Sequence, residues 1–165
     1  KSGVFSTNLY ILHSNGARDL IIKQTNNIDD IKQVLCHVDI YDTISDDNSP
    51  ESKDYEPPVG EDYRYYAGYV NSVIIGLMIY HPYLDGEECH VQVLPKHREE
   101  YAKQFGEQSL SLRDRTRPLY AEIPEFYKNV LDFAKINGFK VIDTQLNNFT
   151  KHGKTYNTKV LLWDS

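Results

Sequence analysis

Three strand-like runs follow one another between residues 63 and 95, and they constrain the fold more than any other feature of the chain. The runs read YRYYAGYVNS, VIIGLMIYHPYL and EECHVQVLP. Asn71-Ser72 and Asp85-Gly86 separate them, and residue pairs of this kind are typical of tight hairpin turns. The sequence therefore predicts an antiparallel meander at the centre of the fold.

The segments around this meander change between helical and strand-like periodicity. A polar stretch with three prolines, residues 44–62, is predicted to be a long surface loop. The order of the segments predicts an α+β domain with a mixed sheet over residues 18–165, preceded by an extended arm at residues 1–17. Further strands are expected at 18–24, 118–123, 141–153 and 154–164, and helices at 25–38, 96–112 and 124–137.

Charge and composition exclude several classes of function. The net charge of −6 argues against a nucleic-acid partner, because such proteins owe their affinity to cations that neutralise phosphates. No apolar run approaches the roughly 20 residues that a membrane span needs. Cys36 and Cys89 lack the CxxC spacing of a metal or redox pair, so we expect free thiols and a cytoplasmic protein. His81, His97 and His152 show no ligand spacing, and no metal site is expected.

Two local motifs carry a resemblance to a known family. The stretch VLPKHR, Val93–Arg98, runs from a strand through a proline into a helix, and DFAKINGFKVIDTQLNNFTKHGKTYNTKVLLW closes the chain. In this order the motifs resemble the GCN5-related N-acetyltransferase (GNAT) superfamily, over about residues 18–163. The stretch from His90 to Phe139 also resembles a divergent subgroup of GNAT-like proteins encoded by tailed bacteriophages.

The resemblance implies a fold and a reaction. It implies a GNAT-like, mostly antiparallel mixed sheet flanked by helices, with a splayed strand pair that admits acetyl-CoA, and acyl transfer to an amine on a small molecule or a protein. The pyrophosphate would lie at a helix N-terminus, where free N–H groups and the helix dipole favour anions. The implied cofactor-binding residues are Val93, Leu94, Lys96, Arg98, Tyr101, Ala102 and Lys103.

The chain departs from the family pattern at two places. Tyr101 and Lys103 stand where the family has the glycines of its pyrophosphate loop, and Ala134 stands where it often has a tyrosine general acid. These departures leave open an alternative, a non-catalytic GNAT-like phage accessory or virion component that acts through contacts with phage structural proteins. Such a protein would lie in the host cytoplasm or in the virion.

His90 and Tyr127 are the candidate catalytic residues. His90 lies on the strand that would line the cleft, and imidazole titrates near neutral pH, which suits a general base. Tyr127 would replace the missing tyrosine acid from an earlier turn of the helix. The structural alternatives are a packed strand histidine and a helix-surface aromatic. Carboxylates at strand ends are further candidates for the base: Glu87, Glu88 and Glu122.

Overall fold

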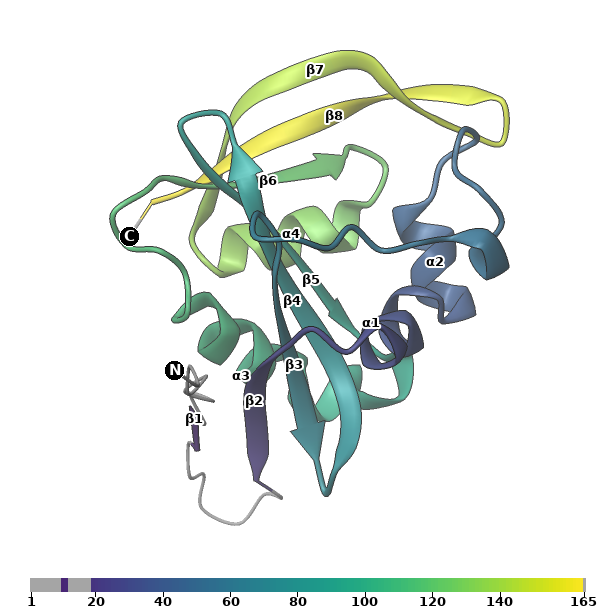
Figure 1. The fold of residues 1–165 in the computed structure, drawn as a ribbon. Helices are drawn as coiled ribbons and strands as arrows, with labels where there is room; N and C mark the ends of the chain where they lie inside the picture. The colour runs from purple at the N-terminus through teal and green to yellow at the C-terminus, as the bar shows by residue number, and fades with distance from the viewer. Residues whose placement is uncertain (1–9, 12–18, 165) are drawn as a thin grey trace.

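The computed structural model describes residues 10–11 and 19–164, and within them a single sheet of eight strands with helices on both faces (Figure 1). The sheet order is β1-β2-β3-β4-β5-β6-β8-β7. The strands are β1 (Tyr10–Ile11), β2 (Leu20–Thr25), β3 (Arg64–Val70), β4 (Val73–Tyr83), β5 (Gly86–Val93), β6 (Leu119–Pro124), β7 (Phe139–Lys151) and β8 (Lys154–Trp163). The helices are α1 (Ile28–Leu35), α2 (Val38–Ile44), α3 (Arg98–Leu110) and α4 (Lys128–Ile136), with 3-10 turns η1 (Ser52–Asp54) and η2 (Pro95–His97).

The predicted meander is confirmed and forms the centre of the sheet. Strands β1 to β5 pair antiparallel in chain order, β5 and β6 pair parallel, and β6, β8 and β7 are again antiparallel. The expected α+β class with a mixed, mostly antiparallel sheet is therefore confirmed. Asn71 and Ser72 both have positive φ, 50° and 63°, as a two-residue hairpin turn with matching twist requires.

Two layers of helices explain why β4 reads as a continuous apolar run. Residues of α3 and α4 form one core with Ile75 and Tyr80, and residues of α1 and α2 form a second core with Leu77 and Ile79. The helix pairs lie on opposite faces of the sheet (Figure 1). A strand covered on both faces has no solvent side, so its alternation of apolar and polar residues disappears.

Two helix boundaries differ from the prediction. The helix expected over residues 25–38 ends at Leu35, and a second helix, α2, follows because the extended backbone of His37 starts a new N-cap. The helix expected to begin at Pro124 begins at Lys128 instead. Pro124 is the last residue of β6 and pairs with Thr158, so the ladder with β8 prevails over the preference of proline for a helix start.

Two further expectations concern the ends of the domain. The arm expected at residues 1–17 lies outside the described residues except for Tyr10–Ile11, whose backbone pairs with β2. Within the described part, even the longest helix, α3 with 13 residues, is too short and too polar to cross a membrane.

Gly86 forms a tight joint between the two halves of the sheet. The turn expected at Asp85-Gly86 lies one residue earlier, and Gly86 already pairs with Tyr83 as the first residue of β5. A Cβ atom at Gly86 would lie 2.1 Å from the carbonyl oxygen of Pro118, next to β6. Glu87 N–H donates to that same carbonyl at 2.9 Å, so the backbones are in direct contact.

We expect Gly86→Ala to lower the free energy of unfolding by about 2–3 kcal/mol, because a methyl group there must displace backbone rather than a flexible side chain. Urea unfolding measures the change. Gly106→Ala is the matched control: its Cβ would meet the ring tip of Phe133 at 3.2 Å, and helix α3 favours alanine, so we expect a change within about 1 kcal/mol. Equal stability of the two variants would contradict a direct backbone contact between Gly86 and Pro118.

Candidate active site

β5 and β6 separate after two residue pairs. Glu87 pairs with Leu119 and Glu88 with Tyr120, after which β5 continues along β4 and β6 continues along β8. Beyond Glu88 the edge of β5 that faces β6 has no strand partner among the described residues. The implied splayed pair is therefore present, and it opens earlier than Leu94, where the resemblance would place it.

A cleft of about 770 Å³ occupies the space between the separated strands. This volume lies within the range of small-molecule and cofactor sites. The wall also includes residues of α2, α3, α4, β7 and β8 and of the segment that precedes α4. Its lining includes Ile44, Glu88, His90, Val91, Val93, Arg98, Ala102, Glu122, Phe126, Tyr127, Lys128 and Phe149.

The predicted cofactor-binding residues fall into two groups. Val93, Arg98 and Ala102 line the cleft. Four others are not among the residues that line it: Leu94 and Tyr101 are buried in the two cores, and Lys96 and Lys103 are exposed. Tyr101 therefore neither covers the cleft nor blocks it, because the helical stripe that it shares with Phe105 turns it inward.

The stretch that would form a phosphate loop is helical from Pro95 onward. The 3-10 turn η2 runs directly into α3. Within it the N–H groups of His97 and Arg98 donate to the carbonyls of Leu94 and Pro95. The N–H groups of these two residues are thus used inside the turn and are not available to a diphosphate.

Arg98 connects the end of β5 to the start of α3 at the wall of the cleft. Its Nε donates to the carbonyl of Val93 at 2.9 Å. This bond does not use the two terminal nitrogens of the guanidinium, which is a strong donor group for phosphate. Arg98 is therefore the cation of this stretch that is best placed toward the cleft.

Two histidines and a glutamate meet on one face of the sheet at the inner end of the cleft. His81 on β4 pairs across the strands with Glu88 on β5, and His90 lies two residues further on the same face. The Nε2 atoms of the histidines are 2.8 Å apart. Oxygens of Glu88 lie 3.5 Å from His81 Nε2 and 3.4 Å from His90 Nε2.

Burial shifts the pKa values of Glu88 and His90. It raises the pKa of Glu88 to about 8, and the carboxylate of Glu122 acts in the same direction. Partial burial and the neighbouring His81 both lower the pKa of His90, although 39% of its side chain is exposed. At neutral pH the imidazole of His90 is therefore uncharged.

Glu122 is held on the opposite wall by neighbours that the sequence did not single out. The hydroxyl of Tyr83 donates to its Oε1, and Gln145 Nε2 donates to the same oxygen at 2.8 Å. Burial and this carboxylate raise the pKa of Tyr83. The three side chains come from β4, β6 and β7, so the bonds connect both halves of the sheet.

Tyr127 lines the cleft from a position just before α4, not from within the helix as expected. Its ring centroid lies 4.0 Å from that of Phe126 and 6.3 Å from that of Phe149. Burial raises its pKa, so it carries its proton at neutral pH. Ala134, at the usual place of the tyrosine acid, is buried on α4.

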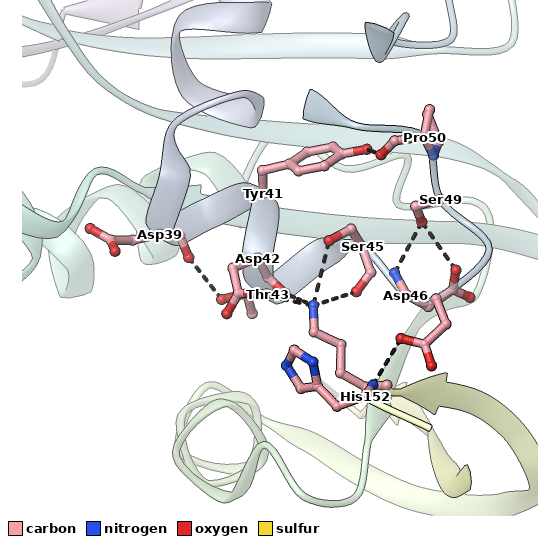
Figure 2. A network of polar contacts seen from close by, with 11 residues as sticks. Asp39, Tyr41, Asp42, Thr43, Ser45, Asp46, Ser49, Pro50 and His152 are labelled. Carbon is pink, nitrogen blue, oxygen red and sulfur yellow. Dashed lines mark hydrogen bonds and ion pairs between the residues drawn. The ribbon is translucent and has the colours of Figure 1, made fainter. Parts of the chain in front are cut away.

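A polar latch joins the tip of the β7–β8 hairpin to the segment that follows α2 (Figure 2). Lys151 Nζ donates to the carbonyl oxygens of Asp42 and Ser45. The carboxylate of Asp47 accepts from the N–H groups of His152 and Gly153, each at 2.8 Å. The latch lies beside the ends of α2 and β7 that line the cleft, so it fixes this wall.

Comparison with known proteins identifies the fold. Neither a protein-family model nor a curated protein matches the chain. Among solved structures, a protein described provisionally as a phosphinothricin N-acetyltransferase is similar with a TM-score of 0.70 and 16% identity, covering 88% of this chain and 98% of that one. The ribosomal-protein-S18-alanine N-acetyltransferase from Escherichia coli gives 0.66 and 13%, covering 87% and 92%.

A third similar structure is a mutant of the spermidine N-acetyltransferase SpeG from Vibrio cholerae. Its TM-score is 0.56 at 14% identity, covering 62% of this chain and 64% of that one. This chain thus spans less than two thirds of that enzyme. Together the three structures establish that the chain has the GNAT fold. None of them is described as a phage protein, so the narrower resemblance to phage proteins gains no support.

We expect Lys151→Met to loosen the latch, because it keeps the aliphatic stem and leaves two carbonyl oxygens without their charged donor. The free energy of unfolding should fall by about 1–3 kcal/mol. Amide hydrogens of residues 47, 152 and 153 should exchange faster in the native state. Lys154→Met, an exposed neighbour on β8, is the control and should alter neither measurement. If it had an effect as large as that of Lys151→Met, the contacts of Lys151 would not be what holds the hairpin tip in place.

Proposed function

We propose that the chain is an acetyl-CoA-dependent N-acyltransferase that acts on an amine. The observation that carries the proposal is the separation of β5 from β6 after Glu88, which leaves an open strand edge along a cleft of about 770 Å³. An open edge offers backbone groups that can pair with the amides of a pantetheine arm. The GNAT fold and its named acetyltransferases support the same reaction.

The residues at hand fit acetyl-CoA unequally along its length. The cleft suits the thioester and the pantetheine, and it is lined by Val93 and Ala102. The diphosphate would bind the guanidinium of Arg98 instead of the N–H groups of a glycine loop. Lys96 and Lys103 are exposed cations nearby. Side-chain cations hold phosphate less rigidly than a set of fixed backbone N–H groups.

In this proposal acetyl-CoA supplies an activated acyl group as a thioester. His90 removes a proton from the ammonium of the acceptor, and the amine nitrogen then bonds to the carbonyl carbon as the carbon–sulfur bond breaks. Tyr127 donates its proton to the leaving sulfur, and the second proton of the nitrogen goes to solvent. The products are an amide and CoA.

The acceptor side of the cleft favours a cationic amine. Glu122 lies on the wall opposite Glu88, and the rings of Phe126, Tyr127 and Phe149 also line the cleft. The carboxylate of Glu122 attracts an ammonium group, and aromatic faces stabilise cations and apolar chains. Glu88, with its pKa raised to about 8, adds a negative charge only at alkaline pH. We therefore expect a primary amine on a small molecule or a protein N-terminus.

A second candidate function rests on the helical start of α3. The amides of His97 and Arg98 are used within η2, so the site lacks the backbone cradle of an efficient phosphate site. This observation favours a non-catalytic GNAT-like protein, such as a phage accessory or virion component, that keeps the fold for protein contacts. The two candidate functions differ in acetyl-CoA binding, which the acyltransferase requires and the non-catalytic protein does not.

Calorimetry with acetyl-CoA tests the proposal, and we expect binding that depends on the cleft. Ala102→Trp should weaken it at least about tenfold, because an indole there fills space beside Val93. Glu107→Trp, on the exposed side of the same helix, is the matched control and should leave the affinity unchanged. No binding at about 1 mM acetyl-CoA, the upper end of ordinary KM values, would overturn the enzymatic function.

Turnover separates the role of His90 from binding. Release of CoA thiol is measured with spermidine, a peptide with an N-terminal alanine, and phosphinothricin, in the presence of a chelator. His90→Gln should lower kcat by about 10²–10⁴ with unchanged acetyl-CoA affinity, the effect of losing a general base. Equal kcat for the variant and the parent would remove His90 from the mechanism.

A further inference from the structure

The group of His81, Glu88 and His90 has a composition that acyl transfer does not require. A base needs one imidazole, whereas here two imidazole nitrogens and a carboxylate lie within 4.8 Å of one another. The three side chains come from paired positions of β4 and β5, so the sheet itself sets their spacing. Two nitrogens and an oxygen directed to one place are a ligand set typical of transition metals.

The tautomer of His81 leaves its inward nitrogen free to bind a cation. Its Nδ1 lies 3.0 Å from the carbonyl oxygen of Pro82, which can only accept, so Nδ1 carries the proton. Nε2 of the neutral ring then presents its lone pair. A backbone carbonyl on the far nitrogen is the arrangement that orients and activates metal-bound histidines.

The distances require only a small adjustment. In a tetrahedral site with bonds of about 2.0–2.1 Å, neighbouring ligand atoms lie about 3.3 Å apart. The nitrogen–oxygen distances are close to this value, at 3.5 Å from His81 Nε2 to Glu88 Oε2 and 3.4 Å from His90 Nε2 to Glu88 Oε1. Each involves a different oxygen, so the carboxylate has to turn until one oxygen faces both nitrogens. The nitrogens, at 2.8 Å, share one proton as a hydrogen bond and would separate by about 0.5 Å. His90 is the outer of the two rings and has the room to move.

We propose that His81, Glu88 and His90 bind a divalent transition metal ion, with Zn²⁺ as the best match to two imidazoles and one carboxylate. On binding, Glu88 releases the proton it carries to solvent, and His90 moves its proton from Nε2 to Nδ1, so that a carboxylate oxygen and both Nε2 atoms coordinate the ion. The ring of Tyr63, 5.3 Å from that of His81, holds the inner ligand in place. Glu88 and His90 line the cleft, so the fourth position is open to water or to a ligand in the cleft.

The zinc site does not rest on the proposed function, because its test contains no acetyl-CoA. Tag-free protein treated with chelator is titrated with ZnCl₂ in a calorimeter, and we expect one ion per chain. His81→Gln and His90→Gln should each weaken the affinity at least about 100-fold, more than the loss of an outer partner causes. His152→Gln, at the exposed hairpin tip, is the matched control and should bind as the parent does.

A measurement on the unaltered protein covers the case in which a variant fails to fold. In long-range ¹H–¹⁵N spectra, zinc should shift the Nε2 resonances of His81 and His90 and leave those of His97 and His152 in place. An excess of Mg²⁺ should not reverse the shift, since magnesium prefers oxygen ligands. Zinc that binds equally to the His81 and His90 variants, or that shifts other histidines instead, would overturn the site.

Discussion

The short parallel contact between β5 and β6 is the constraint on which the rest of the molecule depends. Two residue pairs hold the halves of the sheet together, and the close approach of Gly86 to Pro118 fixes them there. Each strand then follows its own antiparallel partner, β4 or β8, and the two ladders diverge. The cleft is therefore a result of sheet topology and not of a loop, which explains how it persists although the sequence around it departs from the family pattern.

The two ends of the cleft differ in how firmly the structure forms them. At the acceptor end, hydrogen bonds connect α2 to β7 and join β4, β6 and β7, and the carboxylate of Glu122 is held by donors from two strands. At the other end, a 3-10 turn and a helix replace a glycine loop, and Arg98 is the main cation on the wall. Recognition by side chains requires ordering of long, flexible groups, whereas fixed backbone N–H groups are ordered in advance.

Turn residues and the periodicity of apolar residues predicted most of the fold. The features that they missed depend on pairing between strands that are distant in the sequence. Turn chemistry predicted the hairpin at Asn71-Ser72, and the order of the segments predicted the α+β class with a mixed sheet. The family resemblance assigned Tyr101 to the cofactor, but its side chain is buried with Phe105 in the core on one face of the sheet. No local pattern groups His81 with His90, because nine residues separate them and only the register of β4 against β5 brings them together. The end of β6 at Pro124 was missed for a similar reason, since pairing with β8 overrides a local helix signal.

The polar latch at the hairpin tip has a consequence for how a bound molecule leaves. The halves of the sheet are attached at Gly86 on one side of the cleft and at Lys151 and Asp47 on the other, so they form a closed frame. A closed frame cannot widen by a hinge rotation of one half, because either attachment would have to break first. A bound molecule wider than the opening can therefore leave only after the hairpin tip frays. For such a molecule, the lifetime of its complex with the protein would follow the local unfolding rate of residues 150–153 rather than the strength of contacts inside the cleft.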